Sequence, residues 1–242
     1  MESLEAELSR ARELSVKALA DAIESIGFEC TRCGGCCTAE RTAEGDREPH
    51  TATLFPDEAR QLQAAGSEAE DHGWRDVTRP MPYGIDGGDG GNDTDDESED
   101  DGPGGDEPSG ETFEWAIQTD HCGDCTFYTE TGDGTGACTV HEDRPLVCRT
   151  YPFSVALGGT SQPMGEAVDR EGLVRAHECE GLGRDISREA AEELAEALKE
   201  RAIRELEEAI AVRDNYRPRP DAGGIVVHDS EGAKRPDGTP LE

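Results

Sequence analysis

The 242-residue chain has few large apolar side chains, since Leu, Ile, Val and Phe together number 37, or 15% of the residues. Aromatic residues make up only 5%. This low apolar content, beside a net charge of −33, is typical of chains that are disordered over much of their length. The composition therefore excludes two conventional domains and allows one small domain with long polar appendages.

Long apolar runs and basic surfaces are also missing. No run of 18 apolar residues occurs in the sequence, which argues against a membrane-spanning helix. Only 23 residues are Lys or Arg, against 56 Asp and Glu, so a basic surface for nucleic acid is not expected. The first residues lack the basic and apolar regions of a secretory signal. We therefore expect a cytoplasmic protein without nucleic-acid or membrane partners.

Lysine is scarce even among the basic residues, because only Lys17, Lys199 and Lys234 occur beside 20 Arg. Many carboxylates with almost no lysine are what we expect of a halophilic protein from a cytosol with molar salt. At such ionic strength the Debye length shrinks to about 3 Å, which screens the repulsion between carboxylates. An acidic protein of an ordinary cell is the alternative interpretation.

Two long amphipathic helices are predicted near the ends of the chain. In residues 3–26 apolar side chains recur at steps of three and four, and Gly27 is suited to end this helix. Ser187 is suited to cap a second helix that runs to about Arg213. A short helix is predicted from Pro56 to near Gly66, because proline suits the first turn of a helix.

Short strands are predicted between the helices. Residues 126–129 and 137–140 flank a Gly-rich turn and predict a β-hairpin, and residues 113–117 and 153–157 are further strand candidates. The predicted fold class is α+β: a small, irregular, metal-nucleated domain with a short β-hairpin, flanked by N- and C-terminal helices. The predicted parts are a helix at 1–27, a cysteine-cluster domain at 28–83 and 112–184, a disordered acidic insert at 84–111, a helix at 185–214 and a flexible tail at 215–242.

The predicted fold depends on metal, because little of the chain can form an apolar core. Residues 84–111 contain 12 acidic residues, nine Gly and no basic residue, so they cannot bury a core. In the remaining chain, burial offsets little of the conformational entropy, about 1.5 kcal/mol per ordered residue. A structural metal site supplies on the order of 10 kcal/mol. We therefore predict that metal nucleates the fold and that the metal-free protein is largely unfolded.

Nine cysteines without an export signal indicate metal binding or catalysis, because thiols stay reduced in the cytosol. The first group is Cys30, Cys33, Cys36 and Cys37, in which Gly34 and Gly35 allow tight wrapping of the backbone. The C-x2-C-x2-C run is a spacing that holds an iron–sulfur cluster, whereas zinc sites more often use separated C-x2-C pairs. Adjacent side chains of an extended chain point to opposite faces, so Cys37 could serve a second centre.

A second group of cysteines is spread over the following sequence: Cys122, Cys125, Cys138, Cys148 and Cys179. Four plus four ligands would suit two four-coordinate centres, with one cysteine left over. The Arg144 and Arg149 side chains flank Cys148 and could offset thiolate charge, or could pair with carboxylates instead. No histidine pair has ligand spacing, although His141 and His177 lie near cysteines and are the two to test.

The chain resembles the YkgJ-type cysteine-cluster proteins (CxxCxxCC), which have a domain described as zinc- or iron-chelating. The resemblance rests on Cys30-x2-Cys33-x2-Cys36-Cys37, on Cys125-Thr-Phe127, on the stretch from Cys138 through His141, Arg144, Pro145, Cys148 and Arg149 to Phe153, and on Cys179-x-Gly181-x-Gly183. It implies that the metal ligands are Cys30, Cys33, Cys36, Cys37, Cys125, Cys138, Cys148 and Cys179. Cys122 has no counterpart in the family pattern and is the expected spare thiol.

The expected function is therefore metal binding, with an iron–sulfur cluster or zinc held by eight thiolates for electron transfer or metal handling. A flagellin lysine methylase has a similar cysteine pattern, so a protein lysine methyltransferase is one alternative. The sequence does not supply a complete active site for that enzyme, because a cofactor pocket needs more apolar surface. An interaction module stapled by zinc is the other alternative, and its protein partner is unknown.

Overall fold

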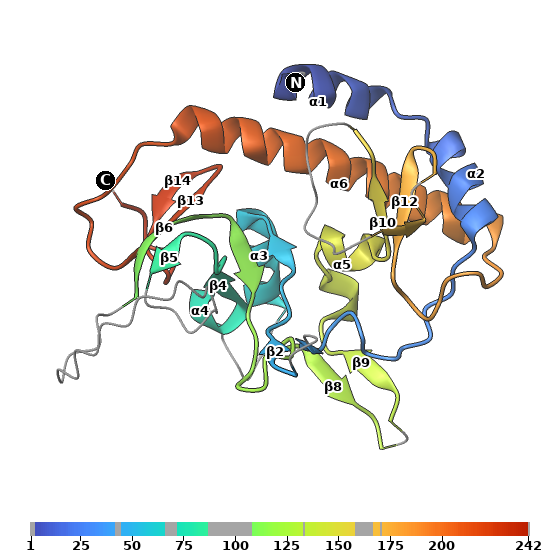
Figure 1. Ribbon diagram of the computed structural model, residues 1–242, viewed down its shortest axis with the longest axis horizontal. Coiled ribbons are helices and arrows are strands. Elements are labelled where there is room, and N and C mark those ends of the chain that lie inside the picture. The colour runs from blue at the N-terminus through green and yellow to red at the C-terminus, as the bar shows by residue number, and fades with distance from the viewer. Residues whose placement is uncertain are drawn as a thin grey trace.

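The computed structural model describes residues 3–41, 45–65, 72–86, 108–132, 134–157, 167–169 and 171–241. The helices in these ranges are α1 (Leu4–Glu13), α2 (Val16–Ile26), α3 (Pro56–Ala64), α4 (Trp74–Val77), α5 (Leu146–Thr150), α6 (Arg188–Asn215) and a 3-10 turn, η1 (His141–Asp143). Helices and small sheets alternate along the chain, and the long helix α6 runs across one side of the molecule (Figure 1). The predicted α+β class and the two flanking helical regions are confirmed.

The strands form several small sheets rather than one. Two two-stranded sheets pair β1 (Glu40–Arg41) with β2 (Arg47–Glu48), and β8 (Tyr128–Glu130) with β9 (Gly136–Cys138). Two three-stranded sheets have the orders β3–β7–β4 (Thr53–Leu54, Trp115–Ile117, Thr78–Pro80) and β10–β12–β11 (Phe153–Val155, Val174–His177, Ala167–Asp169). The four-stranded sheet has the order β14–β13–β6–β5 (Gly232–Lys234, Ile225–Asp229, Ser109–Phe113, Ile85–Asp86). The predicted hairpin is confirmed as the antiparallel pair β8–β9.

The N-terminal helical region is two helices, so the prediction of a single helix over 3–26 is wrong. The break falls at Leu14 and Ser15, where the Ser15 hydroxyl accepts a hydrogen bond from the Ala18 N–H at 3.3 Å. A serine in this position caps a new helix more favourably than it continues an old one. The predicted ends are confirmed at two places, since Gly27 terminates α2 and Ser187 caps α6.

Two large apolar clusters and a small one, formed by Phe55, Leu146 and Ala197, fill the described interior. In core 1, α1 and α2 and the sheet β10–β12 pack against α6, with Leu19, Ile23 and Phe153 fully buried. In core 2, the sheet β3–β7–β4 packs with α3, α4 and the β8–β9 hairpin around Trp115. Residues 30–37, which carry the first group of cysteines and are called the first cysteine segment below, follow α2 of core 1. They lead towards the β8–β9 hairpin of core 2 (Figure 1).

The prediction of a flexible tail over 215–242 is wrong. Strand β13 lies inside the four-stranded sheet, where it pairs in parallel with β6 and antiparallel with β14. Val226 and Val227 are buried there, so this strand is held by apolar packing although a Pro- and Gly-containing segment precedes it. The acidic insert expected at 84–111 is also shorter than predicted, because its two ends pair as β5 and β6. The rest of the insert, residues 87–107, lies outside the described residues.

Candidate metal centre

The first cysteine segment is tied by its backbone to three other parts of the chain. These contacts are hydrogen bonds from Glu29 N–H to Gly181 O (3.0 Å), from Gly136 N–H to Arg32 O (2.8 Å) and from Cys125 N–H to Cys37 O (2.8 Å). Strand β9 carries Cys138, and Gly181 lies two residues after Cys179. The fold thus brings the loops that carry the first and second cysteine groups side by side.

Two glycines permit this close approach. At Gly181, an added Cβ atom would lie 2.3 Å from the Glu29 carbonyl oxygen. At Gly34, which has φ +80°, it would lie 2.3 Å from the Tyr128 hydroxyl. A larger residue at Gly181 would collide with backbone, and one at Gly34 would have to displace the Tyr128 ring at a positive φ, so glycine is favoured at both positions. The expectation that small residues let this segment wrap tightly agrees with these contacts.

The eight candidate thiols differ in exposure. Cys30, Cys33 and Cys36 are exposed, Cys125 is buried, and four are partly buried: Cys37, Cys138, Cys148 and Cys179. Four of the eight, Cys37, Cys125, Cys138 and Cys148, pack against core 2. The candidate site is therefore apolar on one side and open to solvent on the other.

Burial keeps several of these thiols protonated. It raises the pKa of Cys125 to about 11, and the neighbouring Cys138 and Cys36 thiols add to the rise. Burial also raises the pKa of Cys148, with further contributions from the thiols of Cys125, Cys36 and Cys138. At Cys138 burial again raises the pKa, and the positive charge of Arg144 acts in the opposite direction. These three thiols lie in or against the same apolar core 2, which agrees with their effects on one another's pKa.

Cys179 lies close to the exposed thiols of the first segment. Burial raises its pKa, and so do the thiols of Cys33, Cys36 and Cys30. The Gly181 N–H donates a hydrogen bond to the Cys179 sulfur at 3.4 Å. The neighbouring Tyr151 has a pKa raised to about 12, first by burial and then by Cys179. Its hydroxyl donates to the Glu178 carbonyl, which fixes the ring beside these thiols.

Cys36 and Cys37 stand between these two sets of thiols. Their sulfur atoms are 3.8 Å apart, and this contact raises the pKa of Cys36. The Cys36 thiol in turn raises the pKa of Cys125, Cys138, Cys148 and Cys179. The eight cysteines come from five places in the chain: residues 30–37, 125, 138, 148 and 179. The backbone contacts of the first segment and the packing against core 2 bring these places together near the adjacent pair.

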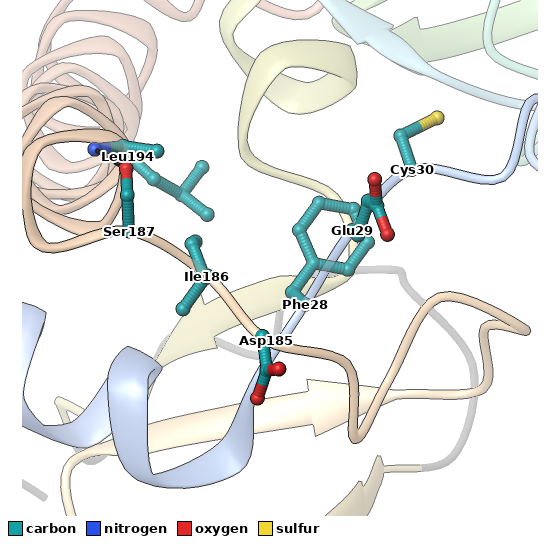
Figure 2. Close-up of a pocket in the computed structure, with 8 residues that line it drawn as sticks. Phe28, Glu29, Cys30, Asp185, Ile186, Ser187 and Leu194 are labelled. Carbon is teal, nitrogen blue, oxygen red and sulfur yellow. Dashed lines mark hydrogen bonds between the residues drawn. The ribbon is translucent and has the colours of Figure 1, made fainter.

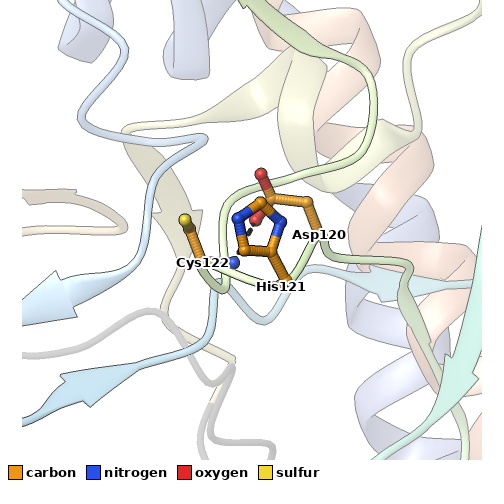
Figure 3. Close-up of side chains that lie close together, drawn as sticks. All are labelled: Asp120, His121 and Cys122. Atoms are coloured by element: carbon orange, nitrogen blue, oxygen red, sulfur yellow. Dashed lines mark hydrogen bonds between the residues drawn. The ribbon is translucent and has the colours of Figure 1, made fainter.

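The thiols are neighbours without being packed as closely as ligands of one ion. Within the described ranges, three ligand atoms lie within 4.8 Å of one another only in the group of Asp120, His121 and Cys122 (Figure 3). Sulfur atoms on one tetrahedral ion, bound at about 2.3 Å, have to be closer than this. Metal binding would therefore draw the thiols together, and the loops that carry them have to move.

The sequence analysis missed the group of Asp120, His121 and Cys122. Three consecutive residues with oxygen, nitrogen and sulfur donors were a visible signal, but only Cys122 was singled out. The Asp120 carboxylate accepts a hydrogen bond from the Cys122 N–H at 2.8 Å, which folds the loop back on itself. Asp120 and His121 are exposed, and Cys122 is partly buried.

The two histidines chosen from the sequence have ordinary surroundings. His177 is 5% exposed and its Nε2 lies 2.9 Å from the Ser154 hydroxyl, as expected for a packed histidine. His141 is exposed, and its Nδ1 lies 3.2 Å from the Glu142 carboxylate. Arg144 donates from Nε to the His141 carbonyl at 2.9 Å, which holds its guanidinium group near Cys138.

A cavity of about 320 Å³ opens beside the start of α6. Its lining is formed by residues before Cys30 and around the Ser187 cap: Phe28, Glu29, Asp185, Ile186, Ala190 and Leu194. Cys30 lies at its edge with the sulfur turned away from the other lining residues (Figure 2). The cavity is therefore adjacent to the thiols but is not the space between them.

The fold and the gathered thiols define a cysteine-rich α+β protein with a candidate metal centre between its two cores. A family described as "Putative zinc- or iron-chelating domain" (CxxCxxCC) matches residues 29–180, more than half of the chain. The chain belongs to this family. No curated protein and no solved structure shows significant similarity to it. Among the described residues, none of the helices combines the length and the apolar character that crossing a membrane requires.

Proposed function

We propose that the protein binds zinc, or iron in an iron–sulfur cluster, through the thiolates of the eight cysteines named above. The observation that supports the proposal is the set of backbone contacts that joins the first cysteine segment to the loops of Cys125, Cys138 and Cys179, together with the packing of four thiols, Cys148 among them, in or against core 2. The family description supports a zinc or iron ligand. Electron transfer or metal handling is the role that such a site would serve.

The donor set supports soft or borderline metal ions. A set made only of thiols suits zinc, copper(I) and iron–sulfur clusters, and does not suit magnesium or calcium. Metal binding would replace the protons of buried thiols and so remove the cost of keeping several sulfur atoms together. Bound zinc would supply structural cross-linking without redox chemistry, whereas an iron–sulfur cluster would supply one-electron chemistry.

Anaerobic purification followed by metal and sulfide analysis tests the proposal. Bound iron with equal sulfide and visible charge-transfer absorption would support an iron–sulfur protein, and a colourless protein with zinc would support a zinc protein. Cys148→Ser should lower the bound metal, whereas Cys122→Ser, at the expected spare thiol, should leave it unchanged. The proposal would be contradicted if the full chain, purified under anaerobic conditions, contained no metal and took up neither zinc nor iron on reconstitution.

Removal of metal tests its role in folding. We expect a strong chelator to decrease the helical signal in circular dichroism, because thiolate–metal bonds join segments with little apolar surface between them. Unchanged circular dichroism after complete removal would contradict a structural role. Methyl transfer from S-adenosylmethionine to a lysine peptide is the assay that would favour the enzymatic alternative.

A further inference from the structure

Two sets of four thiols can be distinguished by what surrounds them. The inner set, Cys37, Cys125, Cys138 and Cys148, packs against core 2, and each of its members is buried or partly buried. The outer set, Cys30, Cys33, Cys36 and Cys179, contains three exposed thiols. A centre in the inner set would be shielded by apolar side chains, and one in the outer set would face solvent.

Two members of the inner set, Cys138 and Cys148, lie in regular elements, and Cys125 forms an isolated bridge with Thr119. The Cys125 N–H donates to the Cys37 carbonyl at 2.8 Å, and Cys138 pairs with Tyr128 in the β8–β9 hairpin. Cys148 lies in α5, where the buried Glu58 carboxylate accepts the Leu146 N–H at 2.8 Å. Metal binding would still draw these elements together, because no three of the described thiols lie within 4.8 Å of one another.

The outer set is held by loops at the edge of core 1. Cys30 follows the end of α2, and Cys179 follows the end of β12. The two loops meet through the Glu29–Gly181 hydrogen bond and an isolated bridge between Phe28 and Leu182. The spacing of Cys30, Cys33 and Cys36 allows three ligands on one centre, and Cys179 is the nearby fourth thiol.

Cys36 and Cys37 are divided between the sets by their environment. The Cys37 side chain contacts core 2, and its carbonyl is bonded to Cys125 of the inner set. The Cys36 side chain is exposed, as are Cys30 and Cys33 of the outer set, although it lies near thiols of both sets. The peptide bond between the two residues therefore marks the boundary between the sets.

We propose that the eight thiols form two four-thiolate centres, an inner one that stabilises the fold and an outer one from which metal is exchanged. This inference rests on the proposed function and assigns a different role to each of the two centres. In an exchange step, a thiolate of an acceptor forms a bond to the outer metal ion as one cysteine–metal bond breaks. No oxidation state changes, and the released cysteine takes up the proton that the incoming thiol gives up. The inner centre is less accessible to such a ligand, because its four thiols are buried or partly buried against core 2.

Partial removal of metal, followed by alkylation, tests the division in the wild-type full-length protein. The metal-loaded protein is treated briefly with EDTA, the free thiols are labelled with iodoacetamide, and the labelled peptides are identified by mass spectrometry. We expect Cys122 to be labelled before chelation, and the four outer cysteines to be labelled after the first metal is lost. The inner cysteines should stay unlabelled until the second, slower loss. Labelling spread evenly over all eight, or metal loss in a single phase, would overturn the proposal.

Matched variants provide the second measurement. Cys179→Ser should abolish the fast phase of metal loss, keep the slow phase and leave the circular dichroism spectrum nearly unchanged. Cys138→Ser should lose the slow phase together with much of the folded signal, while Cys122→Ser should behave as the wild type. A fast phase that persists in Cys179→Ser would contradict the assignment of the outer set. Failure of the proposed function is distinguishable, because the wild-type protein would then bind no metal at all.

Discussion

At the scale of single residues, the candidate metal centre depends on two glycines as well as on its cysteines. Gly181 lets the Cys179 loop touch the segment that leads into Cys30, and Gly34 lets the cysteine segment pass beneath Tyr128. Neither glycine can bind a metal. Both glycines affect how closely the cysteine loops can approach each other, because an added methyl group would lie 2.3 Å from a neighbouring atom.

Gly181→Ala should weaken the contact between the Cys179 loop and the first cysteine segment. The added Cβ would lie 2.3 Å from the Glu29 carbonyl, so the loop has to shift. Overpacking of this kind typically costs about 1–3 kcal/mol. We expect less bound metal and a lower thermal midpoint, measured by metal analysis and circular dichroism. Gly132→Ala is the control, because an added Cβ there meets no neighbouring atom, and an equal effect of both changes would contradict the explanation.

Glu114 illustrates a residue that costs stability at neutral pH. It lies between β6 and β7 with φ +69°, and its N–H donates to the His228 carbonyl. Burial raises its pKa from 4.5 to about 7, and the nearby carboxylates of Glu208 and Glu205 on α6 add to the rise. Burial also raises the pKa of Glu208, beside which lie Asp229 and Lys234.

Glu114→Gln should therefore stabilise the protein in a pH-dependent way. The folded state holds the Glu114 proton more tightly than the unfolded state does, so its contribution to stability is present below pH 4.5 and is lost as pH rises to about 7. The variant should gain up to about 3 kcal/mol at pH 8, and much less at pH 5. Denaturant unfolding at the two pH values checks this. The exposed Glu193→Gln on α6 is the control, and a gain independent of pH would contradict the prediction.

At the scale of elements, helix α5 is the part that connects the candidate metal centre to the core. This five-residue helix carries Cys148, and the buried Glu58 carboxylate caps its N-terminus. On its other side the buried Arg201 of α6 donates to the Thr150 hydroxyl at 2.9 Å and to the Glu205 carboxylate at 2.7 Å. So short a helix is not stable by itself, and its position depends on these contacts.

Arg201→Met should displace α5 and with it Cys148. Glu205 is partly exposed, so losing the hydrogen bonds of the buried Arg201 guanidinium group should cost about 1–3 kcal/mol. We expect a lower unfolding midpoint and faster loss of the slowly released metal under a chelator. Arg12→Met is the matched control, because Arg12 forms an exposed ion pair with Glu207, for which less than about 1 kcal/mol is expected. Similar effects of the two changes would rule out this role of Arg201.

The sequence predicted elements where local signals are strong and failed where distant pairing decides. Pro56, Ser187 and Gly27 marked helix ends correctly because capping depends on a few neighbouring residues. Strand β13 was missed, although Ile225, Val226 and Val227 are β-forming residues, because its partner β6 lies more than a hundred residues earlier. The prediction of a single N-terminal helix was wrong at Ser15, because this serine caps a new helix although the apolar pattern continues through it.

The candidate site was predictable in its residues but not in its geometry. The spacing of the cysteines and the family resemblance named eight thiols, and the fold brings the segments that carry them into contact. Their division into buried and exposed sets depends on which loops pack against core 2, and spacing along the chain does not encode that. The metal ligand set itself stays a prediction until metal is measured in variants.

At the scale of the whole molecule, charge repulsion opposes compaction. The net charge of −33 on 242 residues exceeds what the 23 basic residues can neutralise locally. Arginine ion pairs counter part of it, as at Arg188, which contacts Asp21, Glu24 and Glu192 across α2 and α6. Because these pairs are partly exposed, each contributes little.

Added salt should therefore stabilise the protein. Raising KCl from low concentration to about 1 M shortens the Debye length to about 3 Å and screens the repulsion between carboxylates. We expect the thermal midpoint, followed by circular dichroism on the metal-loaded chain, to rise by several degrees over this range. A midpoint that is independent of KCl would contradict both the stabilisation and the interpretation of the composition as halophilic.

The parallel pairing of β13 with β6 also has a consequence for biosynthesis. Strand β6 ends at Phe113, whereas β13 begins at Ile225, so the ribosome adds more than a hundred residues before the two can meet. Until then β5 and β6 form a two-stranded ribbon with an open edge, which is marginally stable in water. The four-stranded sheet can therefore close only after α6 and β13 have been synthesised, and a nascent chain stalled within α6 would expose an unpaired strand to chaperones or to aggregation.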